Sequence, residues 1–222
     1  MNYPTLVVLV GLAIPAFAQA GILEELKELN PQYAAQVERG EQVMLTQGSQ
    51  GPWPKAWVFR TIDARPEEVA AVFFDVETHK DYFPNVYRSA ITSRVNPTTV
   101  EVEYALSVPI VSDEVYTVRD ILSAYDGGKA YKVEWTMLKA SSSRHIEGYI
   151  LIESFGEKTI IEYYNYIIPG SGMSSLPFVK GKAMAQLAQT VTALAKETVR
   201  RRSEQADRLA DLVLRIRQAL GK

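Results

Sequence analysis

The sequence contains no cysteine and only two histidines among its 222 residues. Without cysteine the chain cannot form disulfide bonds, use a thiolate nucleophile or hold a metal through sulfur. It also has no P-loop, no G-x-S-x-G or G-x-G-x-x-G motif and no histidine pair at metal-binding spacing. Few groups therefore remain for covalent or metal catalysis, and we expect neither a cofactor nor a metal.

An excess of charge of one sign is also missing. The chain has 24 Lys and Arg against 26 Asp and Glu, for a net charge of −2. Nucleic-acid binding requires a basic surface that neutralises phosphates, so we expect no nucleic-acid partner. An apolar content of 47% and a charged content of 23% are typical of an ordinary globular protein. A chain of this length can bury a large core without covalent cross-links.

The N-terminus has the pattern of a secretory signal. Residues 6–17 form an apolar run that is too short to cross a bilayer. Ala16, Ala18 and Ala20 follow in two A-x-A patterns, which predict cleavage after Ala20 and a mature chain that begins at Gly21. The first four residues carry no Lys or Arg, and the alternative is an N-terminal membrane anchor. We therefore expect residues 1–20 to be a signal peptide and the protein to be periplasmic or secreted.

The first part of the mature chain is predicted to contain helices and a hairpin. Residues 22–39 have apolar side chains every three or four positions, which indicates a helix that Pro31 kinks or splits. Two β-prone runs, 43–46 and 56–62, flank a turn and predict a hairpin. A helix begins at Pro66, and a shorter helical stretch follows at 77–82. The apolar face of the first of these two helices is predicted to be Val69, Val72, Phe73 and Val76.

The apolar period then changes from 3.6 to 2, which predicts a sheet. The expected strands are 100–107, 115–124, 131–138, 144–155 and 159–168, and their short connections require antiparallel neighbours. A long helix is expected from about Pro177, with Met184, Leu187, Val191, Leu194 and Val199 on its apolar face. Residues 203–222 form a last amphipathic segment, which we expect to pack on the N-terminal helix. Its apolar stripe consists of Leu209, Leu212, Val213, Ile216 and Leu220.

The order of these elements resembles the helix-grip fold of START-like (SRPBCC) proteins. Residues 62–69 (IDARPEEV) are similar to the strand-to-helix entry of that superfamily. Residues 74–77 (FDVE) and 82–86 (YFPNV) resemble its second helix and turn, and 176–179 (LPFV) resembles the start of its long helix. Polyketide cyclase-like and coenzyme-Q-binding-like bacterial members are the most similar in pattern.

The resemblance implies an α+β fold in which a curved antiparallel sheet wraps around a long C-terminal helix. The START-like ligand-binding domain would span residues 41–202. An N-terminal helix (21–40) and a C-terminal amphipathic helical extension (203–222) would flank it.

The same resemblance implies that the protein binds and transfers a hydrophobic molecule, such as a lipid, a sterol-like or a quinone-like compound. A helix that lies across a curved sheet leaves an apolar space, and a ligand that enters it gains about 25 cal/mol per Å² of apolar surface removed from water. Two alternatives remain. One is a cyclase/aromatase-like or hydrolytic enzyme that uses the same cavity. The other is an interaction protein whose terminal helices contact a membrane or a partner chain.

The candidate ligand-binding residues lie on the predicted strands and at the start of the long helix. They are Tyr104, Arg119, Trp135, Met137, Tyr149, Tyr163, Asn165, Phe178, Val179 and Met184, with Tyr164 and Tyr166 as further candidates. A tyrosine suits a mostly apolar ligand because it offers an apolar ring and one hydroxyl. Plain core packing is the alternative. Tyr163 and Asn165 share one face of a strand and Tyr164 and Tyr166 the other, so only one pair can face the ligand.

The polar candidates have two interpretations each. Arg119 is predicted to pair inside the cavity with Glu103 or Glu134 or to bind a ligand carboxylate. The alternative is that it lies in water on the outer face. His145 is either a general acid or base or a surface histidine at the start of a strand. With Tyr163, it is the weak candidate for a catalytic role. His79 lies near Asp75 and Asp81 but lacks a third metal ligand, so no metal site is predicted.

Overall fold

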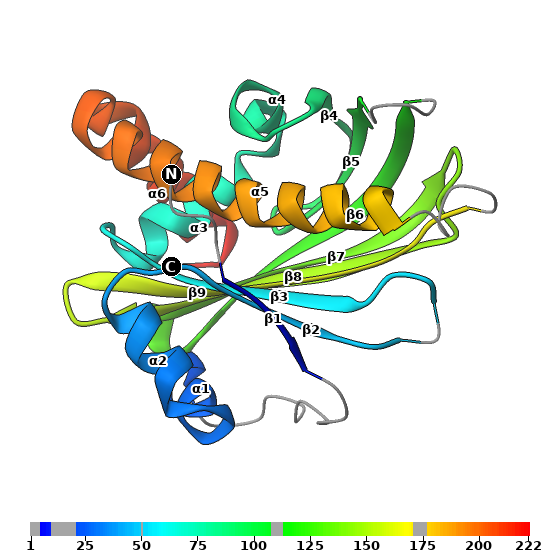
Figure 1. Ribbon diagram of the computed structural model, residues 1–222. Coiled ribbons are helices and arrows are strands. Elements are labelled where there is room, and N and C mark those ends of the chain that lie inside the picture. The colour runs from blue at the N-terminus through cyan, green and yellow to red at the C-terminus, as the bar shows by residue number, and fades with distance from the viewer. Residues whose placement is uncertain (1–4, 10–20, 50, 108–112, 171–176) are drawn as a thin grey trace.

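A computed structural model describes residues 5–9, 21–49, 51–107, 113–170 and 177–222 (Figure 1). Within these residues a single sheet is covered on one side by the long helix α5 (Pro177–Glu204) and on the other by α1 (Ile22–Leu29) and α2 (Pro31–Glu38). We call the side of the sheet toward α5 the inner face and the side toward α1 and α2 the outer face. The α+β helix-grip arrangement predicted from the sequence is confirmed.

The sheet has nine strands in the order β1-β2-β3-β9-β8-β7-β6-β5-β4. Their bounds are β1 Thr5–Leu9, β2 Val43–Gln47, β3 Lys55–Ile62, β4 Val86–Asn96, β5 Thr99–Leu106, β6 Glu114–Tyr125, β7 Ala130–Ala140, β8 His145–Phe155 and β9 Lys158–Ile168. All neighbours are antiparallel except β1 and β2, which are parallel. Strand β1 belongs to the segment that the sequence predicts to be a signal peptide.

Local sequence signals explain where the helices begin. Asn30 separates α1 from α2, and its Oδ1 accepts a hydrogen bond from the backbone N of Gln32 at 2.9 Å, so the predicted kink is a complete break. Helix α3 (Pro66–Phe74) begins at a proline, and Glu68 caps it by accepting from the backbone N of Arg65 at 2.8 Å. The short helices η1 (Val76–Thr78) and α4 (His79–Tyr82) follow. None of the described helices is both long and apolar enough to cross a membrane.

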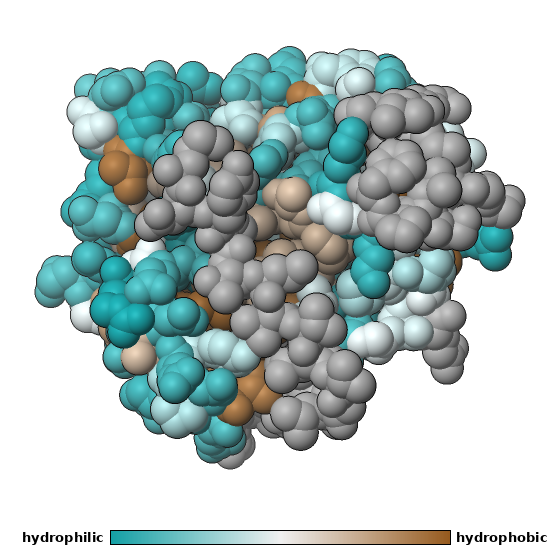
Figure 2. All heavy atoms as spheres, viewed as in Figure 1, coloured by the Kyte–Doolittle hydropathy of each residue, from teal (hydrophilic) through white to brown (hydrophobic). Residues whose placement is uncertain are grey.

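The two faces of the sheet belong to two separate hydrophobic clusters. Inner-face residues such as Val102, Val133 and Ile150 pack with α3, α5 and α6 (Ala206–Ala219). Outer-face residues such as Trp57 and Ile160 pack with α1 and α2. Figure 2 shows a mostly hydrophilic surface with apolar residues exposed in a few patches, which fits an apolar interior enclosed by polar side chains.

Two predictions about the C-terminal helices are wrong. Helix α6 does not pack on the N-terminal helix: its Leu209, Val213 and Ile216 are buried in the inner cluster, where α6 contacts α3 and α5. Val199 is 40% exposed and so does not belong to the buried face of α5. That face continues instead through Thr198 and Arg201, because helical spacing from Leu187, Val191 and Leu194 leads to these two positions.

Candidate ligand-binding site

Four tyrosines from different elements approach one another on the inner side of the sheet. They are Tyr82 on α4, Tyr104 on β5, Tyr116 on β6 and Tyr163 on β9. Tyr104 and Tyr116 are cross-strand neighbours, and their ring centroids are 5.4 Å apart. Burial raises the pKa of all four phenols. All four hydroxyls therefore keep their protons and remain neutral hydrogen-bonding groups.

Trp135 on β7 forms an aromatic floor beside these tyrosines. Its ring centroid lies 5.1 Å from that of Tyr163 and 5.9 Å from that of Phe73. Gly148 is its cross-strand neighbour on β8, and a Cβ at that position would lie only 2.3 Å from Cζ2 of Trp135. The indole can lie on the sheet because position 148 has no side chain.

Asp120 is a buried carboxyl group with apolar residues around it. It is 3% exposed, and its Oδ1 has no hydrogen-bond partner within the described part of the chain. Desolvation raises its pKa to about 8, so it is protonated at neutral pH. Its cross-strand neighbours are the apolar residues Val100 and Trp135. An unsatisfied buried polar atom costs free energy, and in a native protein it calls for an explanation.

Asn165 is the second inner-face residue with an unsatisfied oxygen. Its Oδ1 is buried and has no hydrogen-bond partner among the described residues. The sheet register places Asp120 opposite Trp135, Trp135 opposite Gly148, and Gly148 opposite Asn165. The two unsatisfied residues therefore end a row that crosses four adjacent strands, and the indole lies between them. Three strand spacings separate their Cα atoms by roughly 14 Å.

His79 holds the hydroxyl of Tyr104 in place through a buried hydrogen bond. Its Nε2 is 2.8 Å from the carbonyl oxygen of Phe73, and its Nδ1 is 2.9 Å from the hydroxyl of Tyr104. A carbonyl only accepts, so Nε2 carries the proton and Nδ1 accepts from Tyr104. Burial lowers the pKa of His79 to about 3 and keeps the ring neutral. The described residues contain no group of three or more side chains suited to a metal ion.

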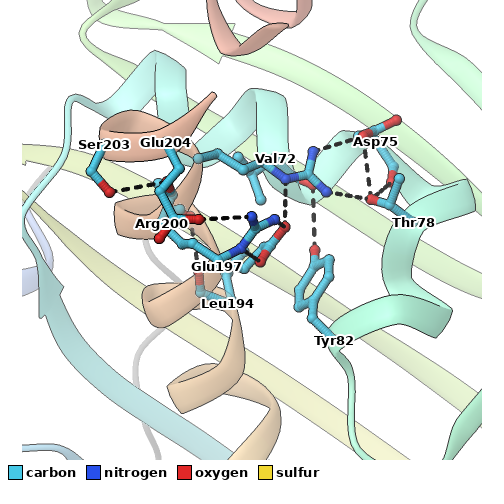
Figure 3. A network of polar contacts seen from close by, with 11 residues as sticks. Val72, Asp75, Thr78, Tyr82, Leu194, Glu197, Arg200, Ser203 and Glu204 are labelled. Carbon is cyan, nitrogen blue, oxygen red and sulfur yellow. Dashed lines mark hydrogen bonds and ion pairs between the residues drawn. The ribbon is translucent and has the colours of Figure 1, made fainter. Parts of the chain in front are cut away.

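An ion network holds the C-terminal part of α5 against the segment before α4 (Figure 3). Arg201 is 3% exposed and donates to Glu197, Asp75 and Thr78, each at 2.7 Å. Its guanidinium also lies 5.9 Å from the ring centroid of Tyr82. The network thus positions one of the four tyrosines.

The structure places six of the predicted ligand-binding residues with the inner face and its helices. They are Tyr104, Trp135, Met137, Tyr163, Asn165 and Met184. Val179 lies half-buried in the first turn of α5. The side chain of Phe178 lies outside the described residues.

Arg119 and Tyr149 lie on the outer face. Of the two interpretations of Arg119 the exposed position on the outer face is thus confirmed, and the predicted place of both residues in the ligand-binding wall is wrong. Arg119 pairs with Glu101 at 2.8 Å, not with Glu103 or Glu134. The hydroxyl of Tyr149 donates to Glu162. Both follow from strand alternation, since their inner-face neighbours point the other way.

The remaining aromatic and catalytic candidates on β8 and β9 also belong to the outer side. Tyr164 and Tyr166 are part of the outer cluster. His145 is half-exposed and lies 3.0 Å from Glu147, so it is the surface histidine of the two interpretations. Asp120, Tyr82 and Tyr116 were missed. An acidic residue between Val118 and Leu122, at the apolar positions of β6, was a signal that could have revealed Asp120.

The comparisons support the fold and not an activity. No protein-family model matches the sequence, and no curated protein matches it either. Among solved structures, the chain is similar to a STAR-related lipid transfer protein fragment from Xanthomonas axonopodis, with a TM-score of 0.62, 15% identity and coverage of 71% of this chain and 93% of that one. Human StAR-related lipid transfer protein 5 gives a TM-score of 0.58 and 14% identity, over 82% of this chain and 97% of that one.

The similarity extends to a protein from a biosynthetic pathway. The di-domain aromatase/cyclase StfQ from the steffimycin pathway has a TM-score of 0.52 and 10% identity, over 67% of this chain and 46% of that one. Proteins described as lipid carriers and as cyclases thus share one architecture with this chain, and at such low identity the likeness concerns the fold alone. With its nine-stranded sheet and the long helix across the inner face, the chain has the START-like helix-grip fold.

Proposed function

We propose that the protein binds a largely apolar small molecule between the inner face of the sheet and α5, and that it carries this molecule without changing it. The observation that supports this most directly is the row from Asp120 to Asn165. It combines two unsatisfied buried oxygens with an indole and nearby phenols. A core that only had to be stable would not keep two such oxygens without partners.

The row also limits the kind of ligand. A neutral, protonated Asp120 can donate one hydrogen bond and accept others, and the amide oxygen of Asn165 accepts. An anionic head group would meet no described cation among the residues of this row. We therefore expect a neutral ligand that carries hydroxyl or amide groups and has an apolar middle part over Trp135. A hydroxylated lipid or a sterol-like molecule has this chemistry.

Native mass spectrometry and solvent extraction of the purified full-length protein test the proposal. We expect one apolar molecule per chain, with at least one hydrogen-bond donor. Asp120→Leu keeps the approximate size of the side chain but removes both oxygens, and we expect it to retain the ligand several-fold less well. Glu101→Gln on the outer face is the matched control. An empty protein that also fails to take up added hydroxylated lipids would contradict the proposal.

A chemical reaction in the same site is the second candidate, because Asp120 holds a proton at neutral pH, within electrostatic range of Tyr163, and could act as a general acid. The extraction experiment separates the two functions. A carrier returns the added molecule unchanged, whereas an enzyme returns a product in amounts above one per chain. In the second case Asp120→Asn would abolish turnover.

We also infer that the protein is exported and that its signal peptide is removed after Ala20, on the basis of the apolar run and the A-x-A patterns. Intact-mass measurement of the protein from the periplasm or the medium checks this. The expected chain begins at Gly21.

A further inference from the structure

Three carboxyl side chains come together on the outer face of the sheet, beside the first turn of α1. Glu25 lies on α1, Glu153 on β8 and Glu162 on β9. Glu162 is 0% exposed, and neither its Oε2 nor that of Glu25 has a hydrogen-bond partner among the described residues. Burial, with added repulsion between the carboxylates, raises the pKa of Glu25 to about 7 and that of Glu162 to about 8. The described residues place no positively charged group in direct contact with these three carboxyls.

The other polar groups around the cluster do not supply this charge. Tyr149 donates its hydroxyl to Glu162, and Glu28 adds a further negative charge beside Glu25. Lys132 on β7 attracts Glu162 only from a distance, because its ammonium donates to Glu134 at 2.7 Å and lies over the ring of Tyr149. Among the described residues these carboxyls also do not form a metal-binding group. What the cluster needs is a small cation with several N–H donors.

The backbone at Gly21 is next to the cluster. The backbone N of Ile22 donates to Oε2 of Glu153 at 2.9 Å, and a Cβ on Gly21 would lie 3.1 Å from the same oxygen. The nitrogen of Gly21 is bonded to the same Cα, so it lies within roughly 6 Å of that oxygen. In the uncut chain this nitrogen is a neutral amide. Cleavage after Ala20 would turn it into an ammonium group.

We propose that Glu25, Glu153 and Glu162 form a binding site for the α-ammonium group of Gly21, which removal of the signal peptide creates. An ammonium group has three donors and a full positive charge, and it suits a site with two unpartnered carboxyl oxygens. The positive end of the α1 helix dipole attracts the carboxylates but opposes an ammonium group at the same place, so the carboxylates must supply the attraction. This inference depends on cleavage after Ala20 and is independent of any ligand on the inner face.

The site would couple export to the docking of the N-terminal helices. Before cleavage, α1 brings Glu25 to two other carboxyls with no cation to compensate them. After cleavage the ammonium group compensates them, and α1 is held against β8 and β9. The contact of α1 with the outer face would thus reach its full stability only in the exported, processed protein.

The test compares two chains that differ by one residue, one beginning at Gly21 and one beginning at Ala20. In the longer chain the ammonium group is displaced by one residue and the Gly21 nitrogen is again an amide. We expect the Gly21 chain to have a melting temperature higher by about 2–4 °C. NMR titration of the labelled α-amine should give a pKa at least one unit above its usual value of about 8, which is a tenfold preference for the charged form.

Glu153→Gln in both chains should remove most of the difference in melting temperature. Glu24→Gln is the matched control, since Glu24 is exposed on the same helix and pairs with Lys27. Equal melting temperatures together with an ordinary amine pKa would overturn the inference, as would an exported chain whose mass shows a different first residue. The amine titration needs no substitution, so it decides the question even if the Glu153 variant does not fold.

Discussion

The two faces of the sheet bury carboxyl groups in opposite surroundings. On the inner face Asp120 is alone among apolar and phenolic neighbours and stays protonated. On the outer face Glu25, Glu153 and Glu162 are gathered together beside the chain's own α1. Both arrangements come from the same strands, because alternate residues of β6, β8 and β9 point to opposite sides.

The difference separates two kinds of unsatisfied group. The inner-face oxygens end a row over an aromatic floor, which is the arrangement expected of a site for a molecule from outside. The outer-face oxygens lie beside a backbone nitrogen that processing would charge. We expect the inner-face oxygens to bind a neutral molecule and the outer-face oxygens to bind a cation. The substitutions below test this contrast.

The largest effect is expected from Arg201→Met, which removes the buried cation next to the inner face. Asp75 and Glu197 would keep their charges without compensation, and we expect the free energy of unfolding to fall by about 3 kcal/mol in urea titrations. Arg200→Met is the control, because Arg200 is 41% exposed and, within the described part of the chain, forms ion pairs only with Glu197 and Glu204 of its own helix. Its loss should stay below about 1 kcal/mol. Similar losses for both would show that the network does not hold α5.

A second comparison uses Asp120→Asn and Glu162→Gln. Both carboxyls have folded-state pKa values near 8, above their ordinary values of 3.8 and 4.5. Their contribution to stability is therefore complete below about pH 4 and is lost as the pH rises toward about 8. At pH 7 we expect Asp120→Asn to raise the free energy of unfolding of the ligand-free protein by about 2–3 kcal/mol. In the chain that keeps residues 1–20, where no ammonium group at Gly21 compensates the carboxylate, Glu162→Gln should raise it by about 1 kcal/mol, because the hydroxyl of Tyr149 partly stabilises the carboxylate.

Urea unfolding at pH 4 and pH 7 measures both effects. At pH 4 the gains should disappear. Loss of stability in acid from His79, whose pKa is lowered, affects all variants equally and cancels in the difference. Gains that do not depend on pH would mean that the two groups are not protonated in the folded protein.

Tyr163 and Tyr164 are neighbours on β9 that face opposite sides. Tyr163→Phe should weaken retention of the extracted ligand by about fivefold, the effect of one hydrogen bond. Tyr164→Phe should leave retention unchanged and cost about 0.5–1 kcal/mol of stability, because its hydroxyl donates to Glu147 at 3.1 Å. Ligand mass spectrometry and urea titration of both variants check this. A larger loss of ligand with Tyr164→Phe would reverse the assignment of the faces.

The smallest effect is expected from Arg119→Ala. The ion pair with Glu101 is at the surface, where Arg119 is 45% exposed. Its loss should cost less than about 1 kcal/mol and leave ligand retention unchanged. A marked loss of ligand in the extraction experiment would show that Arg119 belongs to the binding site.

Period and spacing predicted most of the helices and strands, because the apolar positions in α3 or β5 report burial directly, but the expected strands did not include β1 or β4. They could not say which strand face is inner, since helices cover both faces and β9 is buried at Tyr163 and Tyr164 alike. For the same reason Tyr149 was assigned to the wrong side, and Arg119 was left with two interpretations.

Contacts between distant segments explain the other misses. Arg201 can be buried because its guanidinium pairs with the carboxylates of Asp75 and Glu197, and Asp75 lies far from it in the chain. Helix α6 packs on α3, a pairing that no local pattern encodes. The role of Asp120 depends on which residues its neighbouring strands place beside it.

A missing side chain also sets the shape of the inner face. The ring of Trp135 occupies the space that any substituent at position 148 would need. Adding even a methyl group there would press on both the indole and the backbone oxygen of Tyr164, and so change the surface that a ligand would contact. Ligand selectivity could thus be altered by substitution of Gly148, a residue whose side chain is a single hydrogen atom.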